Sequence, residues 1–194
     1  MELWVATTNQ GKLNEFRNIS GDLFQLHSVS ELSSYAAPPE TGQTFEDNAR
    51  IKAKTLRAMK PGVWVVADDS GLEVPGLNGM PGVHSARYAG EKARDAENVA
   101  KLLKMIQIRS ATNRAAQMVC VLVAFDPSGK EHVVRGVIQG AISTTARGKA
   151  GFGYDPVFMP EGSDKTYAEL GPAAKNQSSH RAQAIRELFR IMQS

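Results

Sequence analysis

The alternation of apolar and polar segments along the first half of the chain predicts strands interspersed with helices. Short apolar runs, typical of buried strands, occupy residues 3–6 and 63–67, and the spaced apolar residues Phe24, Leu26 and Val29 predict another strand. Apolar positions at helical spacing occupy residues 13–19 and 44–59. Gly21 is placed to end the first of these helices, and Thr44 is placed to cap the second.

The second half continues the alternation. After a bend, residues 72–74 resume an extended run, and Asp95 is placed to cap a helix with apolar positions from Val99 to Ile106. Residues 117–125 and 132–142 read as two strands of an antiparallel hairpin. A short strand at 157–158 and a last helix from Ser178 or Ser179 to Met192 complete the chain. The segments 33–42, 75–82 and 146–156 are rich in Gly or Pro and are expected to be loops.

Strands that alternate with helices, together with a hairpin, indicate an α/β fold with a central mixed β-sheet flanked by helices. A length of 194 residues with 42% hydrophobic residues fits one domain with a substantial core. We therefore treat residues 1–194 as a single domain.

Composition excludes several classes of protein. A formal net charge of +3 without a run of like charges does not indicate a nucleic-acid partner. No apolar stretch of about 18 residues predicts a membrane span, and no basic leader is seen, so we expect a cytoplasmic protein. The one cysteine, Cys120, lies in an apolar run and is expected in the core rather than as a nucleophile.

Asp68 and Asp69 follow the apolar run 63–67 and are the most informative pair in the chain. Adjacent carboxylates at the end of a buried strand repel each other and are poorly solvated, so a divalent cation or acid–base chemistry would explain them. Mg²⁺ suits such oxygen ligands. The alternative is structural, since Asp-Ser-Gly is also good turn chemistry.

A polar turn between a predicted strand and a predicted helix consists of Thr7, Thr8, Asn9, Gln10, Gly11 and Lys12. Free amides at a helix start attract anions, and Lys12 adds a full charge, although a simple helix cap would look the same. The spacing of a Walker loop is absent. Glu40, just before the helix at 44–59, is an acidic residue that the helix dipole does not explain. Lys52 within that helix could equally be an exposed lysine.

Phe152, Gly153, Tyr154 and Asp155 place aromatic rings and a carboxylate in a glycine-rich loop, where a ring could stack on a base or anchor the loop. Ser179-His180-Arg181 opens the last helix, either as hydrogen-bond donors or as a polar helix start. A Ser-His-Asp hydrolase is poorly supported, because Ser70 lacks the G-x-S-x-G elbow.

Seven motifs in this order resemble the inosine triphosphate pyrophosphatase family of noncanonical purine nucleoside triphosphate pyrophosphatases. They span nearly the whole chain: Thr7–Lys12, Glu40–Gly42, Phe45–Lys52, Asp68–Gly71, Ser85–Tyr88, Phe152–Asp155 and Ser179–Arg181. The resemblance implies a fold with two lobes and an active-site cleft between them, a homodimer, and hydrolysis of ITP, dITP or XTP to the monophosphate and pyrophosphate with Mg²⁺.

The resemblance also implies roles for individual residues. Asp69 or Asp68 would activate the attacking water, and Glu40 and Asp69 would hold Mg²⁺. Lys12, Lys52 and Lys175, with the amides of residues 7–12, would bind the phosphates. The remaining substrate contacts would come from Ser70 and from Phe152–Asp155, with Phe152 stacked on the purine, while His180 and Arg181 would donate to its 6-oxo group.

Two other functions stay open at this point. One is a pyrophosphatase of the same broad fold that acts on another nucleotide, such as a modified pyrimidine. The other is a nucleotide-binding regulatory protein without turnover. The acidic residues Glu40, Asp68 and Asp69 argue against the second, because binding a triphosphate does not require a base.

Overall fold

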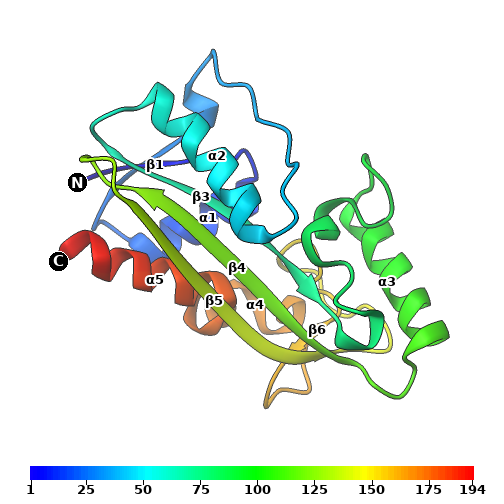
Figure 1. Ribbon diagram of the computed structural model, residues 1–194. Coiled ribbons are helices and arrows are strands. Elements are labelled where there is room, and N and C mark those ends of the chain that lie inside the picture. The colour runs from blue at the N-terminus through cyan, green and yellow to red at the C-terminus, as the bar shows by residue number, and fades with distance from the viewer. The chain divides into compact units, whose positions relative to one another are not determined.

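A computed structural model describes all 194 residues of the chain (Figure 1). Its six strands form one mixed sheet in the order β2-β1-β3-β4-β5-β6. The strands are β1 (Glu2–Val5), β2 (Gln25–Ser28), β3 (Trp64–Glu73), β4 (Ala115–Phe125), β5 (Glu131–Ile142) and β6 (Phe158–Pro160). Strand β1 pairs in parallel with both β2 and β3, whereas β5 and β6 are antiparallel. The predicted fold class is confirmed.

Five α-helices and three short 3-10 helices accompany the sheet. The α-helices are α1 (Gln10–Ser20), α2 (Phe45–Met59), α3 (Asp95–Arg109), α4 (Tyr167–Ser178) and α5 (His180–Gln193). The 3-10 helices are η1 (Val29–Glu31), η2 (Pro75–Leu77) and η3 (Gly82–Arg87). None of the helices has the length and apolar character needed to cross a membrane.

The chain divides into two compact units, and each is built from separate stretches of sequence. The first unit comprises Met1–Asp69, Cys120–Gly136 and Arg181–Ser194, and the second comprises Ser70–Val119 and Val137–His180. The expected arrangement of one domain with two lobes around a cleft stays a prediction.

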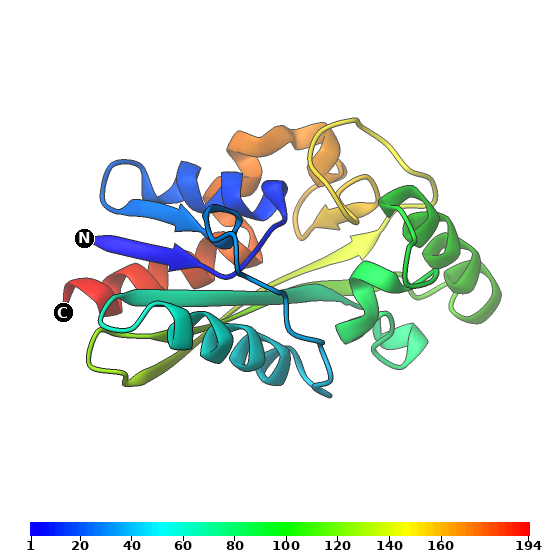
Figure 2. The same ribbon diagram turned by 90° about the horizontal axis from the view of Figure 1, so that it is seen from above.

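In the first unit, side chains of alternating strand residues enter two different cores. Leu3, Val5 and Val66 belong to the core that contains residues of α1 and α5, while Trp4 and Val65 belong to the core that contains residues of α2. Figure 1 and Figure 2 show α2 on one side of these strands and α5 on the other. Because successive strand side chains point to opposite faces, both faces of this part of the sheet are buried.

The second unit has one core of its own. Leu102 and Ile106 of α3 pack there with Leu72 of β3, Phe158 of β6 and Tyr167 of α4. This core fixes α3 and the chain segments that precede and follow β6, and those segments include the predicted aromatic loop.

Most predicted elements are confirmed within a few residues, including the cap of α2 by Thr44 and the start of the last helix. Asp95 is the first residue of α3 rather than its cap, which is Arg94. Helix α4 was not predicted, because Gly171 interrupts it with a positive φ of 83° and Pro172 follows. This break hides the helical spacing in the sequence.

Candidate active site

Asp68 and Asp69 lie within β3 and not at a strand end or turn, so that part of the sequence prediction is wrong. Strand β3 continues from Trp64 to Glu73. The strand can continue through two acidic residues because their side chains alternate. Asp68 falls on the same face as Val66, toward α1 and α5, and Asp69 falls on the face of Val65, toward α2. Each carboxylate therefore meets its own set of cations.

Asp68 is the more deeply buried of the two, with 1% of its surface exposed. Its carboxylate pairs with the Lys12 ammonium of α1, and Nε of Arg181 in α5 donates to its Oδ2 at 2.7 Å. Burial acts to raise the pKa of Asp68, but the charges of Arg181 and Lys12 hold it well below its usual value. Asp68 is thus a permanently ionised group whose oxygens are used to hold two cations.

The guanidinium of Arg181 forms a second ion pair, in which its Nη1 contacts the carboxylate of Glu15 in α1. Burial alone would lower the pKa of Arg181, but Asp68 and Glu15 raise it well above the usual value. Cys120 of β4 completes the surroundings of Asp68, since its thiol lies 3.1 Å from Oδ2. Burial and Asp68 raise the pKa of that thiol well above normal. The prediction that Cys120 is a core residue is confirmed, and a protonated thiol is a poor nucleophile.

Asp69 has a different environment on the other face. Its Oδ1 lies 3.0 Å from the Lys52 ammonium of α2, and the Asn48 side-chain amide lies 3.4 Å from its Oδ2. Burial raises the pKa of Asp69, and the charge of Lys52 only partly opposes this. A carboxylate whose pKa is raised is a better proton acceptor than one held as a permanent anion, so Asp69 is the better candidate for the base.

Glu40 meets the same lysine, with 2.9 Å between its Oε1 and the Lys52 Nζ. The loop that carries Glu40 is fixed to α2, because the backbone N–H of Gly42 donates to Asn48 Oδ1 at 2.8 Å. A side chain at Gly42 would collide with Asp47 and Asn48, so only glycine fits there. Burial alone would lower the pKa of Lys52, but Asp69 and Glu40 raise it. Lys52 is therefore a largely covered charged residue, with 12% of its side chain exposed, and not a fully exposed one.

The two carboxylates Glu40 and Asp69 thus converge on one cationic group. The chain holds no cluster of three or more acidic, His or Cys side chains arranged for a metal. Two carboxylates are nevertheless a sufficient protein contribution for Mg²⁺, which takes its remaining ligands from water and substrate phosphates. The residues present therefore fit this ion, provided that a phosphate-bearing substrate joins them.

The turn between β1 and α1 carries the residues predicted to bind phosphate. Asn9 caps α1, with its side chain accepting from the N–H of Lys12 at 3.1 Å, and the N–H of Asn9 contacts the Thr7 hydroxyl at 3.2 Å. Thr8, Gln10 and Gly11 complete the turn and the first residues of the helix. The cap interpretation is confirmed, and the phosphate-site interpretation stays a prediction. Lys12 is bound to Asp68 and is not a solvated lysine.

The second unit holds the aromatic loop. Asp155 fixes it from within: its Oδ2 accepts from the N–H of Phe152 at 2.9 Å and from the Lys175 ammonium of α4 at 2.7 Å. The same ammonium lies 4.3 Å from the centre of the Phe152 ring. A side chain at Gly151 would collide with Asp155, so the turn closes tightly only with glycine there. Tyr154 is buried and donates from its hydroxyl to the carbonyl of Ser85 at 2.8 Å.

The structure therefore gathers the predicted residues into two groups. Within the first unit lie Lys12, Glu40, Lys52, Asp68, Asp69 and Arg181, which with Glu15 we call the charged cluster. Within the second unit lie Phe152–Asp155 and Lys175, while Ser70 follows Asp69 on β3 and His180 is buried at the start of α5. Base recognition by His180 and Arg181 and phosphate binding by Lys175 stay predictions.

Three residues of these groups were missed from the sequence: Glu15, Asn48 and Asp95. Glu15 follows Lys12 by three positions on one helix, a spacing that indicates a shared face. Asn48 is fully buried in α2, and a polar residue among the apolar positions of a helix is the signal that could have found it. Asp95 was explained as a helix cap, and its contact with the N–H of Gly153 at 2.6 Å has no local sequence signal.

Comparison with known proteins places this geometry in a family. The Ham1 family profile matches residues 3–191. The chain belongs to the Ham1 family. It is 52% identical over 196 residues to a dITP/XTP pyrophosphatase of Bdellovibrio bacteriovorus, covering 100% of this chain and 98% of that protein.

Two solved structures share the fold over the whole chain. The Ham1 protein of Staphylococcus aureus has 41% sequence identity and a TM-score of 0.87, and the match covers 100% of this chain and 98% of that one. A Ham1 protein of Coxiella burnetii has 38% identity and a TM-score of 0.89, with the same coverage. The family resemblance deduced from the seven motifs is thereby confirmed.

Proposed function

We propose that this Ham1-family chain hydrolyses noncanonical purine nucleoside triphosphates (dITP, XTP and ITP) to the monophosphate and pyrophosphate. The observation that carries the proposal is the pair Asp68 and Asp69 on opposite faces of β3, one held ionised by Arg181 and Lys12 and the other with a raised pKa beside Lys52. The name of the Bdellovibrio relative supports the substrate class. Removal of deaminated purines from the nucleotide pool would be the biological role.

The proposed mechanism divides the work among the residues of the charged cluster. Asp69 accepts the proton of the attacking water, since its Oδ1 is partly buried and its pKa is raised. Lys52 and Lys12 face the negative charge that grows on the phosphates, where buried cations act more strongly than in water. Asp68, with Arg181 and Glu15, fixes the position of Lys12. When bound by Glu40 and Asp69, Mg²⁺ would neutralise phosphate charge and orient the phosphate chain.

The loop of the second unit would recognise the base. Phe152 offers a ring face, and the contact with Lys175 holds its ring in one orientation. The donors of His180 and Arg181 would complement the 6-oxo group and leave the amino group of adenine mismatched, which gives discrimination against ATP. The homodimer, the cytoplasmic location and the cleft between two lobes belong to this proposal as expectations from the family resemblance.

The test is hydrolysis of a panel that contains dITP, XTP, ITP, ATP, GTP and a modified pyrimidine triphosphate, with Mg²⁺ and with a chelator. Pyrophosphate and monophosphate are measured as separate products. We expect dITP, XTP and ITP to give equimolar pyrophosphate and monophosphate only with Mg²⁺. Hydrolysis of the pyrimidine triphosphate alone would contradict the proposed substrate class. Release of orthophosphate in place of pyrophosphate would show that another phosphate bond is cleaved. Tight binding without turnover would indicate a regulatory protein.

A further inference from the structure

Asp95, at the first turn of α3, has a contact that its helix does not require. The helix is capped by the box formed between Arg94 and Glu97, in which the N–H of Arg94 donates to Glu97 Oε2 at 2.7 Å. Asp95 takes no part in that box. Its Oδ2 instead accepts from the N–H of Gly153, 58 positions further along the chain, at 2.6 Å.

This contact falls on the part of the loop that Asp155 does not hold. Asp155 binds the N–H of Phe152, and Asp95 binds the next N–H, that of Gly153. Gly153 has a positive φ of 61°, so this residue has the backbone freedom that an anchor must remove. The backbone that carries the Phe152 ring lies between two peptide groups, and Asp155 fixes the one before Phe152 while Asp95 fixes the one after it.

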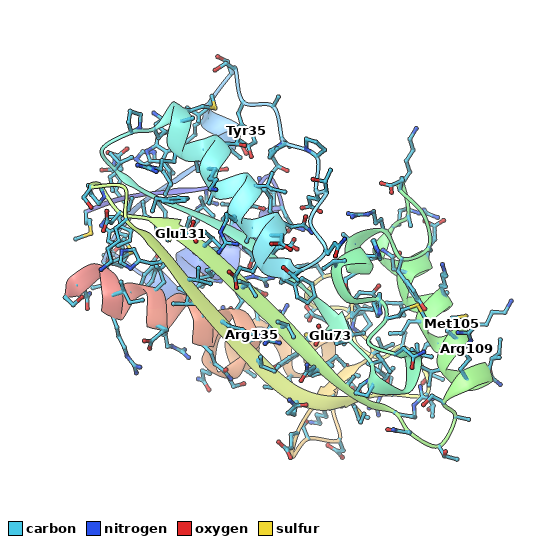
Figure 3. All side chains as sticks on the ribbon, in the orientation of Figure 1. Tyr35, Glu73, Met105, Arg109, Glu131 and Arg135 are labelled. Atoms are coloured by element: carbon cyan, nitrogen blue, oxygen red, sulfur yellow. The ribbon has the colours of Figure 1, made fainter.

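The same end of α3 also holds the partner of Tyr154. Asn98 is buried and binds the end of η3 and the residues after it, donating to the carbonyl of Ala86 at 3.0 Å and accepting from the N–H of Ala89 at 2.7 Å. The adjacent Ser85 carbonyl receives the Tyr154 hydroxyl. Two successive residues of the loop are thus anchored, Gly153 directly by Asp95 of α3 and Tyr154 by Ser85 of η3, which Asn98 ties to α3. The opposite end of α3, with Met105 and Arg109 (Figure 3), makes no such contact with the loop.

We infer that Asp95 is a positioning residue, which holds the turn at Gly153 so that the Phe152 ring is presented to the purine base. It touches no reacting atom, and its effect is confined to recognition of the base. The inference rests on the proposed function, since it assumes that this loop receives a purine. Its consequence is that the loss of the carboxylate weakens ligands that contain a base and leaves ligands that consist of phosphates alone unaffected.

The experiment compares Asp95→Ala with Asp95→Asn and with Glu97→Ala, a matched control on the same exposed helix turn. Steady-state hydrolysis of dITP gives kcat and KM. Calorimetry gives the Kd of IMP, and competition with dITP gives the inhibition constant of inorganic tripolyphosphate. A charged hydrogen bond of this type corresponds to a change of about tenfold in affinity.

For Asp95→Ala we expect KM for dITP and Kd for IMP to rise by about tenfold, with kcat within about twofold of wild type. Asparagine keeps an oxygen acceptor, so Asp95→Asn should restore both values, and Glu97→Ala should change neither. Tyr154→Phe, which removes the second anchor, should raise the same two values. Tripolyphosphate inhibition should be unchanged in every variant.

Three results would overturn the inference: unchanged KM and Kd in Asp95→Ala, a parallel weakening of tripolyphosphate, or a fall in kcat alone. An inactive wild-type chain would refute the proposed function instead. In that case the Kd of IMP still tests Asp95, because binding of the monophosphate does not depend on turnover.

Discussion

The two units hold their candidate site residues in place by different kinds of contact. The first unit surrounds Asp68 and Asp69 with three cations, and the contacts are ion pairs between side chains. The second unit holds the loop that carries Phe152 mainly by hydrogen bonds from the backbone, in which the N–H groups of Phe152 and Gly153 donate to Asp155 and Asp95. The first arrangement controls charge and protonation, and the second controls shape. Substitutions in the two units should therefore change different measured quantities.

The largest effect is expected at Asp69. Asp69→Asn keeps the size of the side chain and removes the proton acceptor, so kcat for dITP should fall by about 10³-fold. Binding of the nucleotide should change by only a few fold. Stopped assays for turnover and calorimetry for binding measure the two effects. Turnover near that of the wild type in the purified variant would exclude Asp69 as base and metal ligand.

Asp68 provides the sharpest contrast within the charged cluster. Asp68→Asn removes one of the two carboxylates that pair with the buried Arg181, and loss of one partner of a buried ion pair costs about 3 kcal/mol or more. Asp69→Asn removes a carboxylate that burial already disfavours, so its free energy of unfolding should be close to that of wild type. Urea denaturation without nucleotide or metal measures both. Equal losses in the two variants would contradict the division of roles between the faces of β3.

Substitutions of Lys12 in the first unit and Lys175 in the second unit allow a direct comparison of the two units through nucleotide binding. Lys12→Ala should weaken binding of ITP more than binding of IMP, by about tenfold, because its charge acts on the phosphate chain. Lys175 contacts Asp155 and the Phe152 ring, so Lys175→Ala should weaken ITP and IMP by similar factors. Calorimetry with both nucleotides measures the four constants. If Lys175→Ala instead spared IMP, its role would be phosphate binding, and the contrast between the units would fail for this residue.

The smallest expected effect is on selectivity at His180. His180→Ala should reduce the ratio of kcat/KM for ITP over ATP by about fivefold, since ITP loses a hydrogen bond that ATP never makes. Arg181→Ala should reduce the same ratio and should also destabilise the fold, because Asp68 loses its buried partner. A parallel fall for both substrates in His180→Ala would show that this residue does not recognise the base.

The sequence predicted the fold and most elements because hydrophobic periodicity is a local property. The sequence also identified Asp68 and Asp69 as candidate site residues, because two adjacent acidic residues directly after a buried apolar run are unusual in proteins. It placed them at a strand end, because the cations that allow β3 to continue come from α1, α2 and α5, more than ten residues away in the chain in every case. Helix α4 was missed for a local reason, the break at Gly171.

The roles of Glu15, Asn48 and Asp95 could not be read from the sequence, because each depends on a partner from another element. Glu15 is paired with a residue 166 positions away. The pair Arg50 and Glu131, the latter labelled in Figure 3, also joins residues that are far apart in sequence, by 81 positions, but its side chains are 26% and 31% exposed, and exposed pairs contribute little to stability. Separation in sequence therefore does not distinguish these two ion pairs in kind, whereas burial does.

The discontinuity of the first unit has a consequence for synthesis on the ribosome. The third segment of the first unit is translated after the other two segments and after all of the second unit, and it carries Arg181 and the core residues Ala184, Ile185, Leu188, Phe189 and Met192. Until that segment leaves the exit tunnel, Asp68 has no guanidinium partner and the core beside it is incomplete. Because domains acquire structure as units, the first unit can close its core only after the whole of the second unit has been translated, so we expect the first unit to be the later of the two to fold.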